Sequence, residues 1–217
     1  MSKRARMTGV QRREQLIQTA EHLFATNGFE ATSMEEIAKA ASVSKPVVYE
    51  HFGSKEAIYA VILDREIRAL VGAIATALQQ STSPRQMVEL AALAYLSFIE
   101  TNADGFRVLT RDAPPTQTSG TYSSVIGDVA IKVQAIVAAQ FKDMGYDPSW
   151  APMYAQMLVG MTAQVSQWWL DVRKPDKYEV AAHLANLAWL GLRHLSHSPE
   201  LITVPADKKA DKKRKGK

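Results

Sequence analysis

The sequence predicts an all-α fold of about nine helices. Apolar residues recur at spacings of three and four along most of the chain, which is the pattern of amphipathic helices. No segment sustains the alternation of a strand for long enough to form a sheet. Clusters of Pro, Gly and Ser separate the helical segments, most clearly at 81–84, 113–120, 145–148 and 174–176. With 217 residues, 47% of them hydrophobic, the chain is long enough to bury a core.

Capping signals mark the first short helices. Ser33 stands three residues before Glu36, so its hydroxyl can accept the Glu36 amide while the carboxylate accepts the Ser33 amide. Ser44 can cap the next helix, in which Pro46 occupies the first turn, where a missing N–H does no harm. The first three predicted helices are 11–27, 34–41 and 45–52.

The second and third of these helices predict a helix-turn-helix unit. They are joined by a short turn, 42–44, and the small side chains of Ala38 and Ala41 allow them to cross closely. The helix over 11–27 covers their apolar side with its own stripe of Leu16, Ala20, Leu23 and Phe24. In such a unit the second helix enters the major groove of DNA.

Positive charge is concentrated at the two ends of the chain. Residues 1–13 hold five basic and no acidic residues, and residues 207–217 hold seven basic and two acidic residues. Residues 14–206 hold 14 basic against 20 acidic residues and are therefore mildly acidic. A basic end is explained by a tether to a polyanion such as nucleic acid, or by a solubilising tail. For the C-terminal run both explanations stay open.

Several classes of function lack their sequence signals. The chain has no Cys, which excludes disulfides, thiol catalysis and Cys-based zinc sites. It shows no Gly-rich phosphate loop and no nucleophile elbow, and His194 and His197 have no third metal ligand near them. No apolar stretch approaches the ~18 residues of a membrane span. We therefore expect a cytoplasmic protein that is not an enzyme and needs neither a cofactor nor a metal.

The segment GFEATSMEEIAKAASVSKPVVYEHFGSKEAIYAVI resembles the DNA-binding domain of the tetracycline-repressor-like (TetR) family of bacterial transcriptional regulators. The resemblance covers about residues 11–63. It implies a homodimer that binds a palindromic operator, represses transcription and releases the operator when a small molecule binds its C-terminal domain. The matching positions are Gly28-Phe29, Thr32-Ser33, Ile37-Ala38, Val43-Ser44-Lys45, Tyr49, His51-Phe52 and Ser54-Lys55-Glu56.

One position departs from the family pattern. The family usually has Gly in the turn where this chain has Ser42, and that position often needs a positive φ. A residue other than Gly pays roughly 1 kcal/mol for such a φ. We therefore expect a slightly altered turn.

Geometry and the resemblance together predict the DNA contacts. Lys45 can donate to guanine and Val47 can touch a thymine methyl, whereas Val48 and Phe52 should pack inward. Tyr49 and His51 match phosphate-binding positions, and Lys55 can grip a phosphate at a helix N-terminus or remain a solvated lysine. Its role as a helix cap can by itself explain the presence of Ser33, without a contact to DNA. The predicted DNA-binding residues are Arg4, Arg6, Arg12, Thr32, Ser33, Ser44, Lys45, Pro46, Val47, Tyr49, Glu50, His51 and Lys55.

The rest of the chain predicts a helical domain for effector binding and dimerisation, as the resemblance implies. Its predicted helices are 55–80, 85–102, 104–112, 121–145, 150–172 and 177–197. The predicted divisions are a basic arm 1–10, a DNA-binding domain 11–63, an effector-binding and dimerisation domain 64–200, and a basic disordered tail 201–217.

Aromatic and Met residues suggest a hydrophobic effector site. They form one face of the helix over 150–172, which is either plain core or a cavity wall. The segments FIETNADGFRVL, LVGM and WWLDVRKP resemble actinobacterial TetR-type regulators of lipid genes, which implies a fatty acyl-CoA or fatty acid, or otherwise another hydrophobic molecule. The predicted effector-binding residues are Phe98, Phe106, Leu109, Tyr122, Val125, Tyr154, Met157, Met161, Gln164 and Trp168.

The last helix predicts a dimer seam, because the family pairs its last two helices in a four-helix bundle. The alternative is that this face packs only within its own subunit. The predicted interface residues are Val180, Leu184, Leu187, Leu190, Gly191 and Leu195. Two other functions stay open: a sequence-independent architectural DNA-binding protein, and a carrier of hydrophobic ligands.

Overall fold

The structure, a computed structural model, describes residues 7–110, 122–201 and 203, and describes no side chains for 122–125. Over these ranges the protein consists of nine α-helices and one 3₁₀-helix, which confirms the predicted all-α class. The elements are α1 (Gly9–Asn27), α2 (Met34–Ala40), α3 (Lys45–Phe52), α4 (Lys55–Gln79), α5 (Pro84–Thr101), α6 (Ala103–Thr110), α7 (Tyr122–Asp143), η1 (Pro148–Trp150), α8 (Ala151–Val172) and α9 (Lys177–Arg193).

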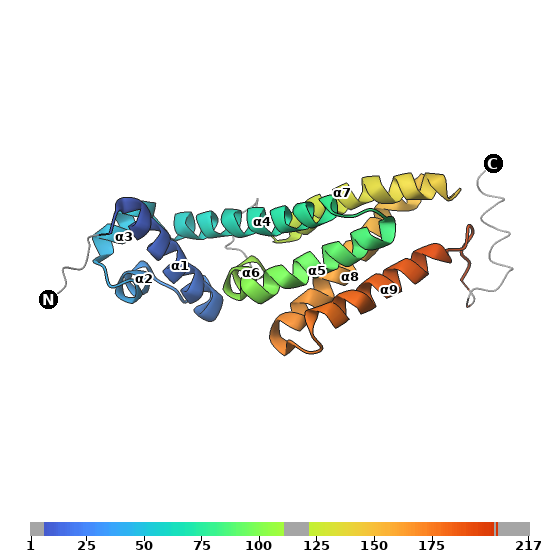
Figure 1. The fold of residues 1–217 in the computed structure, drawn as a ribbon. Helices are drawn as coiled ribbons and strands as arrows, with labels where there is room; N and C mark the ends of the chain where they lie inside the picture. The colour runs from blue at the N-terminus through green and yellow to red at the C-terminus, as the bar shows by residue number, and fades with distance from the viewer. Residues whose placement is uncertain (1–6, 111–121, 202, 204–217) are drawn as a thin grey trace.

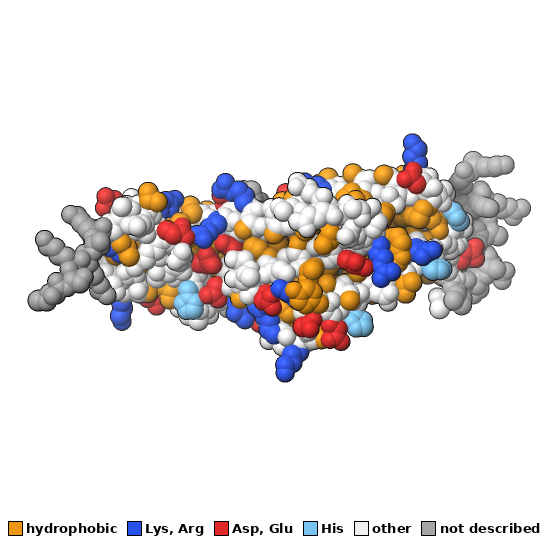
Figure 2. Space-filling model, viewed as in Figure 1, with side chains coloured by type: hydrophobic (Ala, Val, Ile, Leu, Met, Phe, Trp, Pro, Cys, Tyr) orange, Lys and Arg blue, Asp and Glu red, His pale blue; other side chains and the backbone are white. Residues whose placement is uncertain are grey.

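The molecule is elongated, with α1, α2 and α3 at one end (Figure 1). Helix α4 starts beside α3 and runs along the molecule into the second domain. There α7 packs on α8, α9 packs on α5, and α5 also packs on α4. Figure 2 shows hydrophobic side chains at the surface of this second half. None of the helices described combines the length and the apolarity needed to cross a lipid bilayer.

Capping boxes begin α1 and α2. The predicted box at Ser33 is confirmed: its hydroxyl accepts the Glu36 amide at 3.2 Å, and the Glu36 carboxylate accepts the Ser33 amide at 2.7 Å. A second box, in which Thr8 and Gln11 bond reciprocally at 2.9 and 3.2 Å, was not predicted. It starts α1 two residues before the expected position. The Thr-x-x-Gln spacing was its signal in the sequence.

The turn between α2 and α3 keeps a positive φ. Ser42 adopts a φ of 55°, the left-handed conformation that a glycine would adopt without strain. Two backbone bonds hold the turn, from the Ser42 amide to the Lys39 carbonyl at 3.1 Å and from the Val43 amide to the Ala38 carbonyl at 2.9 Å. The helix-turn-helix therefore keeps the turn conformation of a glycine with Ser in its place, and the altered turn that we expected is not found.

Most helix ends lie within one or two residues of their predicted positions, but the end of α9 does not. Helix α9 ends at Arg193 rather than 197, because His194 leaves the helical conformation with a φ of −118°. Helix α6 is described to Thr110, and the remainder of the predicted helix 104–112 lies outside the described residues.

The side chain of Tyr59 links the first three helices to α6. The Tyr59 ring of α4 packs edge-on against Phe24 and Phe29, with centroids 5.2 and 4.9 Å apart. Its hydroxyl donates to the Val108 carbonyl of α6 at 3.2 Å. Helix α6 also packs against α1. The end that holds the helix-turn-helix is thus connected to the second domain through α4 and through α6.

Candidate DNA-binding surface and ligand cavity

Helix α3 presents one side to solvent and one to the core. Val48 and Phe52 are buried, as the sequence predicts for this helix. The predicted DNA-reading side is open: Lys45, Pro46, Tyr49 and Glu50 are exposed, whereas Val47 and His51 are partly buried. Ser44 precedes the helix and is exposed, and its hydroxyl makes no capping bond. This surface is accessible to a DNA major groove.

The ammonium of Lys45 contacts the carboxylate of Glu35, which lies in the first turn of α2. A hydrogen bond from Lys45 lowers the pKa of Glu35, and the same bond raises the pKa of Lys45. Lys45 also lies 5.5 Å from the centre of the Tyr49 ring. Glu35 was not among the predicted DNA-binding residues, because a spacing of ten residues carries no signal for a contact between two helices.

Lys55 is fixed at the start of α4. Its ammonium donates to the Phe29 carbonyl at 2.9 Å and lies 4.2 Å from the centre of the Phe29 ring. Thr32, by contrast, is 1% exposed and donates to the Gly28 carbonyl at 2.8 Å, so its hydroxyl is turned away from the surface. The Ser33 hydroxyl is engaged in its capping box.

The N-terminal arginines divide between α1 and the arm. Arg12 bonds the side chain of Gln15, one turn further along α1. Arg13, not singled out by the sequence, lies 4.4 Å above the Phe52 ring. Arg4 and Arg6 lie outside the described residues.

Helices α4, α5, α7, α8 and α9 enclose an apolar cavity of about 240 Å³. The few polar side chains in its lining are Lys132, Gln140, Thr162 and Arg193. Among the apolar side chains that line it are Leu70, Ile74, Met87, Tyr95, Val133 and Leu158. Because α4 supplies part of this wall, the cavity adjoins the helix whose other end lies beside α3.

The structure places the predicted effector-binding residues in different environments. Met161 lines the cavity, whereas Met157 and Trp168, 55% and 50% exposed, lie on another side of α8 together with exposed Gln164. Tyr154 packs on Phe141, with ring centroids 5.1 Å apart. Buried in the main core are Phe98, Phe106 and Leu109. The structure does not describe the side chains of Tyr122 and Val125.

The predicted interface residues of α9 also face two ways. Val180 and Leu184 are buried in the core of their own subunit, so they cannot form a seam with a second copy. Leu195, beyond the end of α9, packs against a smaller core cluster around Phe141. Leu187, Leu190 and Gly191 are exposed. Only this last group is available to a second subunit.

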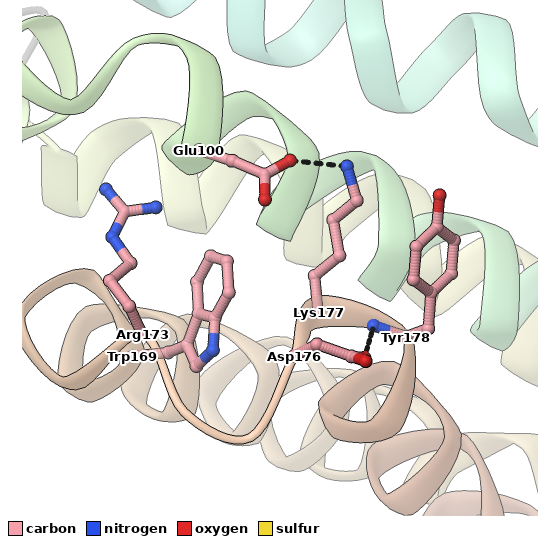
Figure 3. A pocket seen from close by; sticks show the side chains of 6 residues that line it. All are labelled: Glu100, Trp169, Arg173, Asp176, Lys177 and Tyr178. Atoms are coloured by element: carbon pink, nitrogen blue, oxygen red, sulfur yellow. Dashed lines mark hydrogen bonds and ion pairs between the residues drawn. The ribbon is translucent and has the colours of Figure 1, made fainter.

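A more polar hollow of about 410 Å³ lies where the α8–α9 turn meets the end of α5 (Figure 3). Its charged side chains all have partners within the protein: Lys177 pairs with Glu100 at 2.5 Å, and the Asp176 carboxylate accepts the Tyr178 backbone amide at 2.9 Å. Arg173 donates to the Ile99 carbonyl at 3.1 Å, and the Trp169 indole donates to the Pro175 carbonyl at 2.7 Å. These contacts brace the turn against α5.

One buried and one half-buried carboxyl group lie at the junction of the two domains. Glu66 of α4 is 4% exposed, and one of its oxygens has no hydrogen-bond partner among the described residues. Burial raises the pKa of Glu66. Burial, and next the charge of Glu66, raise the pKa of Glu21 on α1 to about 7. A Cβ atom at Gly105 of α6 would lie 2.3 Å from a Glu66 carboxylate oxygen, so three helices meet closely here.

The histidines considered as metal ligands have other contacts. His194 bonds the Leu190 carbonyl at 3.1 Å, and the His197 ring stacks on Tyr146 with centroids 4.2 Å apart. In the described part of the chain no group of three or more His, Cys, Asp or Glu side chains is placed to hold a metal ion.

A helix-turn-helix unit with an exposed second helix, joined by a long helix to a second helical domain, defines the class of helix-turn-helix DNA-binding proteins. Residues 16–62 match the model of bacterial regulatory proteins of the tetR family, and residues 84–191 match the tetracyclin repressor-like C-terminal domain. The chain is 33% identical over 190 residues to the HTH-type transcriptional activator FasR of Mycolicibacterium smegmatis, covering 85% of this chain and 84% of FasR. The chain belongs to the TetR family of transcriptional regulators, which are not enzymes.

Two further similar proteins differ in how much of this chain they match. The HTH-type transcriptional regulator UidR of Escherichia coli K12 is 42% identical over 59 residues, which cover 27% of this chain and 30% of UidR. The crystal structure of a TetR-like transcriptional regulator from Rhodococcus sp. RHA1 matches with a TM-score of 0.71 and 27% identity, over 88% of this chain and 100% of that chain. The match to UidR therefore covers about a quarter of this chain, whereas the Rhodococcus regulator shares the fold along most of it.

Proposed function

We propose that the protein binds a palindromic operator as a homodimer and that a hydrophobic small molecule in the apolar cavity lowers its operator affinity. The observation that carries this proposal is the position of α4, which adjoins α3 at Lys55 and lines the cavity with Leu70, Ile74 and Leu78. Ligand that displaces α4 would displace α3. The predicted division into arm, DNA-binding domain, effector domain and tail is part of this proposal.

The proposal that the protein binds an operator rests on the exposed side of α3. A helix of two turns contacts few base pairs, so two copies about 34 Å apart would supply the specificity of a full operator. We assign base contacts to Lys45 and Val47, and phosphate contacts to Tyr49, His51 and Lys55. The arm residues Arg4 and Arg6 would add electrostatic attraction, as the mildly acidic body of the chain requires.

The proposed dimer interface rests on exposed apolar side chains in α8 and α9. Met157 and Trp168 of α8, and Leu187 and Leu190 of α9, are each about half exposed or more. Soluble monomers rarely expose a large apolar surface. We propose that these side chains and Gly191 form the seam, in place of the inward-facing Val180 and Leu184.

The proposed class of ligand rests on the side chains that line the cavity. An apolar lining with Lys132 and Arg193 suits an amphiphile that has an acyl chain and an anionic head. Fatty acyl-CoA or a free fatty acid is the first candidate, because three segments resemble lipid-gene regulators. The present volume of about 240 Å³ is below the usual range of roughly 300–1,000 Å³ for ligand pockets, so a long chain must displace flexible lining side chains such as Met87 and Met161.

The proposal includes repression: the ligand-free protein would occupy its operator in the cytoplasm, and ligand would release it. FasR is by its name a transcriptional activator, so similarity to it favours the opposite sign of regulation. A promoter–reporter fusion measured with and without the gene for this protein decides between them. Lower reporter output in the presence of the protein supports repression, and higher output contradicts it.

The proposal is tested by fluorescence anisotropy with palindromic and scrambled duplexes, titrated with palmitoyl-CoA and palmitate below micelle formation. We expect preference for a palindrome and loss of that preference with ligand. Equal affinity for all duplexes would favour an architectural DNA-binding protein, and ligand binding without DNA binding would favour a carrier. Native mass spectrometry of protein purified from its own host would identify a copurified effector directly.

A further inference from the structure

The contact between Glu35 and Lys45 joins the two helices of the helix-turn-helix at its exposed side. Glu35 lies in the first turn of α2 and Lys45 is the first residue of α3. Their side chains are 57% and 49% exposed, and they contact each other directly. The pair therefore stands at the solvent side of the unit, next to the start of the helix that we assign to the major groove.

Local stability does not explain Lys45. A cation in the first turn of a helix opposes the helix dipole, so Lys is unfavourable at the start of α3. An ion pair as exposed as this one contributes little to folding. The capping of α2 uses Glu36 and Ser33 and needs neither member of the pair. Contact with a binding partner therefore accounts for the pair better than stabilisation of the fold does.

The two side chains together present a donor beside an acceptor. In the major groove a lysine donates to O6 and N7 of guanine, and a glutamate accepts from N4 of cytosine. These groups lie side by side on the edge of one G·C pair, in the complementary order of acceptor and donor. Lys45 also neutralises the carboxylate of Glu35, which alone would be repelled by the DNA phosphates.

We propose that Glu35 and Lys45 act as one unit that reads a single G·C pair in each operator half-site, and that Glu35 is thereby a specificity-determining residue. This inference rests on the proposed operator binding. It assigns base recognition to α2 as well as to α3. It also gives Lys45 a fixed position, because the carboxylate holds its ammonium before DNA arrives.

The test compares affinity profiles over operators that carry every base pair at every half-site position, placed symmetrically. The variants are Glu35→Ala, Glu35→Gln, Lys45→Met and the double variant Glu35→Ala/Lys45→Met. Glu89→Gln, which breaks the exposed Arg85–Glu89 pair of α5 far from α3, is the matched control. Thermal melts at equal protein concentration check that all variants fold.

We expect the wild-type protein to prefer G·C at one position by on the order of tenfold. Glu35→Ala and Lys45→Met should each flatten the profile at that same position, and the double variant should add little, because the two residues are coupled. Glu35→Gln should shift the preference there towards A·T, since an amide pairs with adenine. The control should keep the wild-type profile.

Two results would overturn the inference while leaving operator binding intact. In the first, Glu35→Ala tightens all operators equally, which means that Glu35 only repels phosphate. In the second, Glu35→Ala and Lys45→Met alter different positions, or their effects simply add. A wild-type protein without preference at any position would instead refute the proposed function and this inference with it.

Discussion

The two ends of the molecule differ in how completely their interiors are filled. At the DNA-binding end Leu16, Phe24, Ile37 and Val48 are almost completely buried, and the aromatic rings of Phe24, Phe29 and Tyr59 pack on one another. In the second domain five helices leave an apolar cavity between them. A filled core moves as one body, whereas a core with a cavity can rearrange around a ligand. The difference indicates a rigid DNA-binding domain attached to a ligand-binding domain that can change its packing.

The sharpest test of this comparison is a matched pair of core truncations. Phe24→Ala should destabilise the protein by about 3–5 kcal/mol, because it opens a hole in a filled core, and operator binding should be lost. Met161→Ala, at the edge of an existing cavity, should cost less than about 2 kcal/mol and should leave ligand-free operator binding intact. Urea unfolding at one protomer concentration measures both. Equal losses would mean that the two interiors are equally constrained.

The next effect is expected at the junction. Gly105→Ala would bring a Cβ atom to within 2.3 Å of the buried Glu66 carboxylate, so α6 or Glu66 must move. Overpacking of this kind costs about 1–3 kcal/mol. Glu66→Ala in the same chain should remove much of that cost, because it removes the group that clashes. A double-mutant cycle by thermal melting measures the coupling, and strictly additive effects would show that the two residues do not constrain each other.

A smaller effect should depend on pH. Glu21 has a pKa of about 7 in the folded protein, well above the roughly 4.3 of an unfolded chain. The folded state therefore binds the proton more tightly, and stability should fall as the pH rises from that lower value through about 7. Glu21→Gln should remove part of this fall, leaving the part due to Glu66, whose pKa is also raised. Unfolding at pH 5 and pH 8 tests this; a variant whose pH dependence equals that of the wild type contradicts it.

The smallest effect is expected in the turn of the helix-turn-helix. Ser42→Gly should relieve the strain of a positive φ and stabilise the protein by about 1 kcal/mol or less. Operator specificity should not change, since the backbone of the turn is already in the left-handed conformation. Melting temperature and operator profile are the readouts. A Ser42→Gly protein with lower stability would show that the serine makes a compensating contact.

The helix-turn-helix could be predicted from the sequence in detail because its signals are local. The Ser33 capping box depends on residues three apart, and the inward direction of Val48 and Phe52 follows from one helical face. The pair of Glu35 and Lys45 could not be predicted, because it depends on how two helices cross.

The second domain was predictable only as a set of helices. Helix α8 carries apolar side chains on more than one face, so periodicity alone could not show that Leu158 and Met161 line the cavity while Trp168 is exposed. The same ambiguity affects α9, where Leu184 is buried and Leu187 is exposed. Which face meets a ligand, a neighbouring helix or a second subunit is decided by tertiary packing.

The central claim, that occupation of the cavity controls operator binding through α4, is tested most directly by filling the cavity. Ala91 lines it, so Ala91→Phe should occupy the space that a ligand needs, and Ala135→Phe, on the exposed side of α7, is the control. Operator affinity is measured with and without palmitoyl-CoA. We expect the wild-type protein and the control to lose at least about tenfold in affinity with ligand, and Ala91→Phe to show no response. An Ala91→Phe protein that folds and responds like the wild type would contradict the account.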